Sequence, residues 1–174
     1  VTSSEFDEKR RIPRKYSCTE EDISLPITWS GAPEGTVSIA LIMDSDQSIA
    51  KVTSHWVIWN IPADATGLPE AVATTTEVLA IGPSTRQGTN GDTTFGYSGP
   101  CPKAVTVEYS EAGRRRLRQI LFNYVFHVYA LDTELDLGPE TTKGKLLKAI
   151  DGHVLAGGEI KGEFVAKKGL VEFY

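Results

Sequence analysis

Two acidic residues and a histidine stand at the ends of two apolar stretches of the sequence. Asp44 closes the run SIALIMD and Asp46 follows it, while His55 opens the stretch HWVIWNIP. A carboxylate near an imidazole raises the pKa of the ring and fixes its tautomer, so the pair can offer N–H donors to an anion. If the two stretches form neighbouring strands, these three side chains can meet in one small pocket.

Further hydrogen-bond donors lie later in the chain. The stretch YSGPCP is a tight, proline-stiffened loop whose backbone N–H groups, starting at Gly99, could cradle an oxyanion, and Tyr124 offers a phenol. Donors of this kind with few fixed positive charges suit a small ligand such as phosphate and do not suit a polyanion. The sequence therefore predicts a small anion pocket.

Each of these residues also has a plainer interpretation. An Asp at the end of a strand usually caps a turn, a His at the start of a strand is usually structural, and Gly-Pro loops are mostly turns. A metal site made from Asp44, His55 and Cys101 would lack any close ligand spacing. We therefore predict no metal and no cofactor.

The elements that would position these residues are mostly strands. Hydrophobic residues alternate with a period of two, which is typical of β-strands, in residues 36–44, 54–61 and 121–131, and a final strand is expected at about 158–165. The segments between them are rich in turn-forming residues. Many strands without a βαβ rhythm indicate an antiparallel sandwich.

Two helices are expected beside the strands. One covers about 110–120, with Ser110 as its N-cap, and the other covers about 141–151 and ends at Gly152. No repeat or linker interrupts the chain, so we predict a single domain over residues 1–174.

Composition limits the classes of function. The chain has 174 residues, 40% of them hydrophobic and 24% charged, and a net charge of −5, which argues against broad binding of nucleic acid. No apolar run approaches the ~20 residues of a membrane span. We predict a cytoplasmic protein. A periplasmic or secreted location stays open because the sequence begins with Val1.

Local catalytic motifs are absent. GYSGP resembles a nucleophile elbow, but Pro100 occupies the position that requires glycine, and GPETTKGKL lacks the phosphate-loop spacing. The two cysteines, Cys18 and Cys101, form no C-x-x-C pair, although a bridge between them stays open. These observations favour a binding protein over an enzyme.

Taken together, several segments resemble the phosphatidylethanolamine-binding protein family, which includes the Raf kinase inhibitor protein, and most closely its bacterial and archaeal branch. They run in order from about Phe6 to Phe164: IPRKYSC, SLPITWSGAPEGTVSIALIMDSD, HWVIWNIP, GTNG, GYSGPCP, YVFHVYALD and GHVLAGGEIKGEF. The resemblance implies an all-β fold with minor α content. It implies a Greek-key sandwich of two antiparallel sheets, short C-terminal helices and an anion pocket at one end.

The resemblance also assigns residues to that pocket. The family's acidic motif matches Asp44 and Asp46, although Ser45 replaces its first proline. The remaining matches are the histidine, the ligand-loop pair and the tyrosine: His55, Gly99, Pro100 and Tyr124. The family places the loops that flank Cys18 and Cys101 near this end, where an oxidising compartment would allow a bridge.

Two departures from the family pattern affect the expected pocket. Phe122 stands where the family usually has a second histidine. His127 cannot replace that histidine because it lies on the opposite strand face from Tyr124. Residues 104–120 are extra sequence with four arginines, which form either a solvated helix face or a docking site for an anionic partner.

The function expected from these observations is binding of phosphate or a phospholipid head group, with no catalytic residues. The resemblance also implies inhibition of a kinase or protease as a regulatory role, and a homodimer stays open. We expect no nucleic-acid partner and no integral membrane association. The alternative is a hydrolase or transferase for a phosphorylated or acyl substrate. It would use His55 as base, Asp44 as orienter and either Ser98 or Cys101 as nucleophile.

Overall fold

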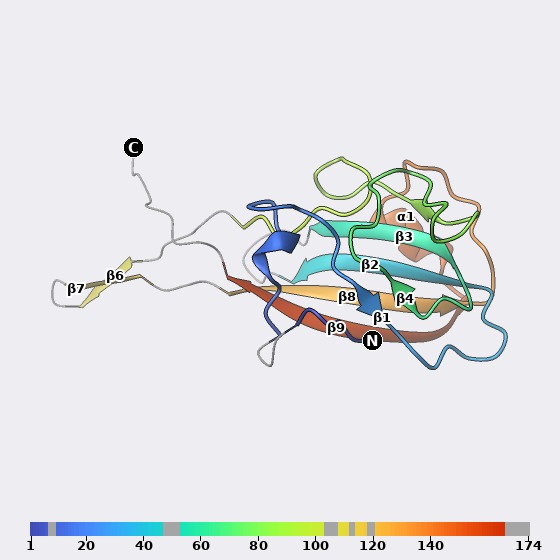
Figure 1. The fold of residues 1–174 in the computed structure, drawn as a ribbon, viewed down its shortest axis with the longest axis horizontal. Coiled ribbons are helices and arrows are strands. Elements are labelled where there is room, and N and C mark those ends of the chain that lie inside the picture. Colours follow the sequence, from blue (N-terminus) through green and yellow to red (C-terminus); the bar gives the residue numbers. More distant parts are fainter. Residues whose placement is uncertain (7–9, 47–52, 103–107, 112–113, 118–120, 166–174) are drawn as a thin grey trace.

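A five-stranded antiparallel sheet forms the centre of the molecule (Figure 1). The computed structural model describes residues 1–6, 10–46, 53–102, 108–111, 114–117 and 121–165. From edge to edge, the strands of the sheet are β5 (Arg86–Gln87), β3 (Ser54–Pro62), β2 (Ser38–Asp46), β8 (Leu121–Leu131) and β9 (Val154–Val165). β2 pairs with both β3 and β8, so distant parts of the chain meet by the crossover that a Greek-key arrangement requires.

A second layer covers one face of this sheet. It contains the short antiparallel pair β1 (Ile27–Thr28) and β4 (Gly67–Leu68), together with the 3-10 turn η1 (Arg14–Tyr16). Ile27 and Leu68 share the larger buried cluster with Ile39, Leu41 and Met43 of β2. The all-β class is confirmed, although the second sheet has only two short strands.

The opposite face of the central sheet packs against the helix α1 (Lys143–Ala149). Leu146 and Ile150 form a smaller buried cluster with side chains of β2 and β3, namely Ala40, Ile42, Val57 and Trp59. The alternation predicted for β2 is therefore confirmed, since its odd residues enter one cluster and its even residues the other. Both faces of β2 are buried.

The predicted C-terminal helix is confirmed with shorter bounds. Thr142 caps α1 by accepting a hydrogen bond from the Lys145 backbone N–H. Gly152, at φ +82°, follows the helix in a left-handed conformation that glycine adopts without strain. β9 starts at Val154, earlier than predicted. The sequence pattern missed its first residues (VLAGG) because alanine and glycine have a low strand propensity.

The helix predicted over 110–120 is wrong. The chain forms the hairpin β6 (Glu108–Glu111) and β7 (Arg114–Leu117), with Glu111 opposite Arg114, and the hairpin projects beyond the end of the central sheet (Figure 1). Ser110 is a strand residue and not an N-cap. Gly113 weakens any helix here, because glycine has a low helix propensity. Of the four arginines, Arg118 lies outside the described residues.

Among the residues that the structure describes, no helix is long and apolar enough to cross a membrane.

Candidate functional site

Three strands bring the predicted residues to one end of the central sheet. Asp44 is the register partner of Ser54 at the start of β3, and Ser45 is the partner of Tyr124 on β8. The expectation that these stretches are neighbouring strands is confirmed. Their relative register then decides which side chains can meet.

An irregularity in the β2–β3 ladder sets the position of His55. Met43 pairs with Trp56 and Asp44 pairs with Ser54, so His55 has no register partner on β2. Its ring meets the Tyr124 ring edge-on, with centroids 5.1 Å apart and planes at 75°. Both residues are buried, with exposed fractions of 7% and 1%. The structure thus brings together His55 and Tyr124.

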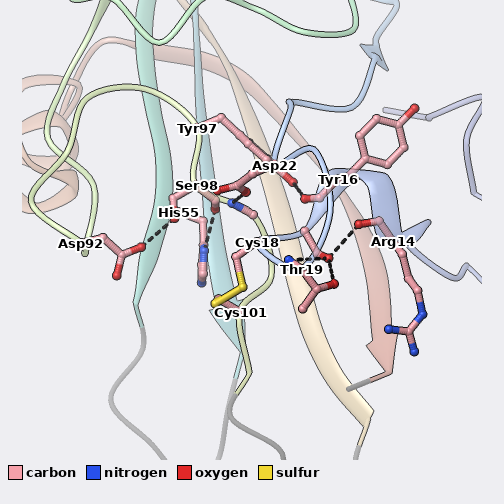
Figure 2. Close-up of a disulfide and its surroundings, with 12 residues drawn as sticks. Arg14, Tyr16, Cys18, Thr19, Asp22, His55, Asp92, Tyr97, Ser98 and Cys101 are labelled. Carbon is pink, nitrogen blue, oxygen red and sulfur yellow. Dashed lines mark hydrogen bonds between the residues drawn. A yellow bond between two sulfur atoms is a disulfide. The ribbon is translucent and has the colours of Figure 1, made fainter. Parts of the chain in front are cut away.

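His55 is held by the loop that follows Tyr97. Its Nδ1 lies 2.8 Å from the backbone oxygen of Ser98, and the Ser98 N–H donates to the His55 oxygen at 2.9 Å (Figure 2). The Ser98 hydroxyl donates to Asp92 Oδ2 at 2.6 Å. This loop orients the imidazole through the Ser98 carbonyl and not through a carboxylate.

The Gly99 N–H, predicted as an oxyanion donor, is already engaged within the protein. It donates to Asp22 Oδ1 at 2.7 Å. The loop packs so closely on the N-terminal segment that a Cβ at Gly99 would clash with the Tyr16 backbone oxygen. Pro100 is buried, and its oxygen accepts a hydrogen bond from the Cys18 N–H at 3.3 Å. Gly99 and Pro100 therefore serve to join two segments of chain.

A disulfide closes the same junction. Cys18 and Cys101 are bridged, with Cα atoms 5.3 Å apart, and the bridge lies beside His55 in Figure 2. Tyr97 strengthens the junction by donating from its hydroxyl to the Tyr16 oxygen at 2.7 Å. The bridge that the sequence left open is formed. Cys101 therefore has no free thiol.

Burial and charge oppose each other at His55. Burial lowers the pKa of the imidazole below 6.5. The hydrogen bond to Ser98 and the charges of Asp92, Asp44 and Asp22 partly offset that effect. The net direction is downward, so the ring is neutral at neutral pH. Burial also raises the pKa of the Tyr124 phenol, which keeps its proton.

Asp44 lies on the other face of the sheet from Tyr124. Its register partner on β8 is Val125, and its Oδ2 pairs with the ammonium of Lys143 at the start of α1. Its Oδ1 is buried and has no hydrogen-bond partner among the described residues. The backbone of Asp46 pairs with Asn123, but its side chain lies outside what the structure describes.

The two departures from the family pattern have distinct positions. Phe122 lies opposite Phe164 of β9 and packs, partly buried, against the same cluster as Tyr124. His127 lies on the opposite face, with Nδ1 3.5 Å from Glu159 Oε2. The prediction that His127 is turned away from Tyr124 is confirmed.

Sequence reasoning missed the groups that hold the site together. Asp22, Asp92 and Lys143 all bond to predicted residues or their neighbours. Only Asp92 had a local signal, because it follows Asn90-Gly91 in a turn where Asn90 Oδ1 accepts its N–H. Within the described part of the chain, no three His, Cys, Asp or Glu side chains are placed to hold a metal ion.

With this geometry in view, comparisons with known proteins agree with one another. The phosphatidylethanolamine-binding protein family model matches residues 2–112 and 115–165. The UPF0098 protein of Methanothermobacter thermautotrophicus is 41% identical over 157 residues, covering 90% of this chain and 92% of that protein.

Two solved structures share the fold. CT736 of Chlamydia trachomatis, described as a phosphatidylethanolamine-binding protein homologue, has a TM-score of 0.73 at 29% identity, covering 97% of this chain and 96% of its own. YbcL of E. coli has a TM-score of 0.77 at 25% identity, covering 95% and 97%. The chain belongs to the phosphatidylethanolamine-binding protein family, in its bacterial and archaeal branch.

Proposed function

We propose that this protein binds a small ligand carrying a phosphate group, either free phosphate or a phospholipid head group, at the His55 site. The His55 site consists of His55, Tyr124 and the loop 97–101. The family assignment and the names of the related structures support a ligand of this class. The proposal is for a binding protein and not for an enzyme.

One observation carries the proposal. His55 and Tyr124 are buried against each other, yet neither His55 Nε2 nor the Tyr124 hydroxyl has a hydrogen-bond partner in the described part of the chain. Neither atom is among the fully buried polar atoms that lack a partner, so both remain accessible to solvent and can bond to a ligand. Two accessible hydrogen-bonding groups on adjacent rings support a ligand at this place.

A titration of the wild-type protein with inorganic phosphate and with phosphoethanolamine, followed by calorimetry, tests the proposal. Saturable binding is expected. Tyr124→Phe removes one hydroxyl with little change of shape, and it should weaken binding by about tenfold. His127→Gln, on the opposite face, is the matched control and should bind like the wild type. Absence of saturable binding by the wild-type protein would refute the proposal.

A hydrolase or transferase remains the second candidate because of the state of His55. A neutral ring whose Nδ1 is held by a carbonyl presents Nε2 as an acceptor, which is the arrangement of a general base. Neither predicted nucleophile supports this candidate, since Cys101 is in a disulfide and the Ser98 hydroxyl donates to Asp92. Turnover of p-nitrophenyl phosphate or p-nitrophenyl acetate that is lost in His55→Gln would favour the enzyme.

Contact with a kinase or a protease rests on the resemblance alone, and assembly as a homodimer is left open by the sequence. They stay predictions, as does the compartment in which the protein works.

A further inference from the structure

The hydrogen bonds of His55 fix which ring nitrogen carries the proton. Nδ1 lies 2.8 Å from the Ser98 oxygen, and a carbonyl oxygen can only accept, so Nδ1 bears the hydrogen. The Ser98 N–H donates back to the His55 oxygen, which ties the two residues together twice. In the neutral ring Nε2 is then a lone-pair acceptor and not a donor.

The carboxylates around His55 each bond to a group other than the imidazole. Asp92 accepts from the Ser98 hydroxyl, Asp22 accepts from the Gly99 N–H, and Asp44 pairs with Lys143 from α1. Among the described residues, the other titratable neighbours are tyrosines: Tyr124 from β8, and Tyr97, whose hydroxyl donates to the Tyr16 oxygen. Burial lowers the pKa of the ring despite these carboxylates, so the neutral tautomer is the form present above about pH 6.5.

The His55 and Tyr124 side chains therefore offer one acceptor and one donor. The acceptor is Nε2 of His55 and the donor is the hydroxyl of Tyr124, since the Gly99 N–H is engaged by Asp22. A phosphate that keeps one proton matches both, because its P–OH can donate to Nε2 while another oxygen accepts from Tyr124. A fully deprotonated oxyanion such as sulfate would place an oxygen lone pair against the lone pair of Nε2.

We infer that the His55 site selects oxyanions that carry their own proton, such as inorganic phosphate at about pH 8, over oxyanions without one. This inference rests on the proposed function and names the ligand class of the same site. A charge-assisted hydrogen bond separates the two classes, so phosphate should bind about ten- to hundredfold more tightly than sulfate at about pH 8.

Lowering the pH should remove this selectivity. Once His55 is protonated, Nε2–H can donate to any oxyanion, so sulfate affinity should rise below about pH 6.5. Sulfate binding in that range should take up a proton. Phosphate binding at about pH 8 should take up none, because both partners are already in their binding form.

Calorimetry of the wild-type protein with sodium phosphate and sodium sulfate, at about pH 8 and about pH 5.5 and in two buffers of different ionisation enthalpy, tests the inference. The expected result is selectivity for phosphate at the higher pH, with proton uptake only for sulfate at the lower pH. His127→Gln should reproduce this pattern. His55→Gln, whose amide can both donate and accept, should bind the two anions alike at both pH values.

The outcomes separate the two proposals. Equal binding of sulfate and phosphate at about pH 8 would overturn the inference while the proposed function stands. Failure of both anions to bind at either pH would overturn both. Because the wild-type protein alone decides between these results, the test does not depend on whether His55→Gln folds.

Discussion

The two faces of the central sheet near the end of β2 differ in how their polar side chains are paired. On the face that meets α1, charged groups lie in pairs: Asp44 Oδ2 pairs with Lys143, although Asp44 Oδ1 has no partner among the described residues, and His127 lies beside Glu159. On the other face, His55 and Tyr124 meet ring to ring. There, one nitrogen and one hydroxyl lack partners among the described residues.

This difference distinguishes a structural role from a binding role. The Asp44–Lys143 pair neutralises a buried carboxylate and fastens the first turn of α1 to the sheet. Removing the pair should lower the free energy of unfolding. His55 Nε2 and the Tyr124 hydroxyl make no hydrogen bond within the described residues. Changing them should therefore affect ligand binding more than stability. The predictions below test this separation, in order of decreasing effect.

The disulfide should give the largest effect. Cys18→Ser with Cys101→Ser opens a bridge between residues 83 apart in sequence, which should lower the free energy of unfolding by about 4 kcal/mol on the chain-entropy account. Denaturant unfolding of the variant measures the loss, and reduction of the wild-type protein by a dithiol should reproduce it. Hydrogen exchange should rise in the loop 97–101 and stay unchanged in α1. An unaltered unfolding midpoint would mean that the bridge adds nothing to the junction.

The ion pair on the α1 face should come second. Lys143→Met leaves the Asp44 carboxylate buried without its cation. Complete loss of one partner of a buried pair costs about 3–5 kcal/mol, and because the Lys143 side chain is 31% exposed we expect about 2–3 kcal/mol. Adding Asp44→Asn should recover part of that loss in thermal or denaturant unfolding. If Lys143→Met instead abolished phosphate binding at unchanged stability, the two faces would have to be treated as one site.

Phe122 tests the binding face directly. Because Phe122 lies on the face of Tyr124, Phe122→His should add a donor there and tighten phosphate binding by about one to two orders of magnitude, the equivalent of ~1.5–3 kcal/mol. His127→Ala, from the same strand but the opposite face, should leave the affinity unchanged. The reverse pattern in a phosphate titration would show that the β8 register in solution differs from the one described here.

The strand faces could be predicted from the sequence because they depend on local periodicity. The alternation in β2 and β8 placed Tyr124 and His127 on opposite faces without any knowledge of the neighbouring strands. The resemblance to a known family added the pairing of His55 with Tyr124. Local periodicity and the resemblance together therefore predicted which strand residues share a face.

The bonds that determine the chemistry of the site could not be predicted, because they join distant parts of the chain. Asp22 reaches Gly99 across 77 residues, and Lys143 reaches Asp44 across 99. Neither has a local sequence signal, and together they engage a predicted donor and a predicted ligand within the protein. The helix predicted over 110–120 was wrong for another reason. Ser110-Glu111 resembles the start of a helix, whereas pairing between β6 and β7 decides the structure.

The pH dependence of stability should give the smallest effect, and it tests whether the binding face keeps its histidine neutral. The pKa of His55 is lowered in the folded protein, chiefly by burial, relative to about 6.5 in the unfolded chain. Above about pH 6.5 both states hold a neutral ring, so the contribution of His55 to stability is complete. As the pH falls below that value, the unfolded chain takes up a proton before the folded protein does. Stability then declines by at most about 1.4 kcal/mol per pH unit until the folded pKa is reached. His55→Gln should lack this decline while His127→Gln retains it, as measured by urea unfolding over the acidic range. Parallel pH profiles for the wild type and His55→Gln would mean that burial does not hold the ring neutral.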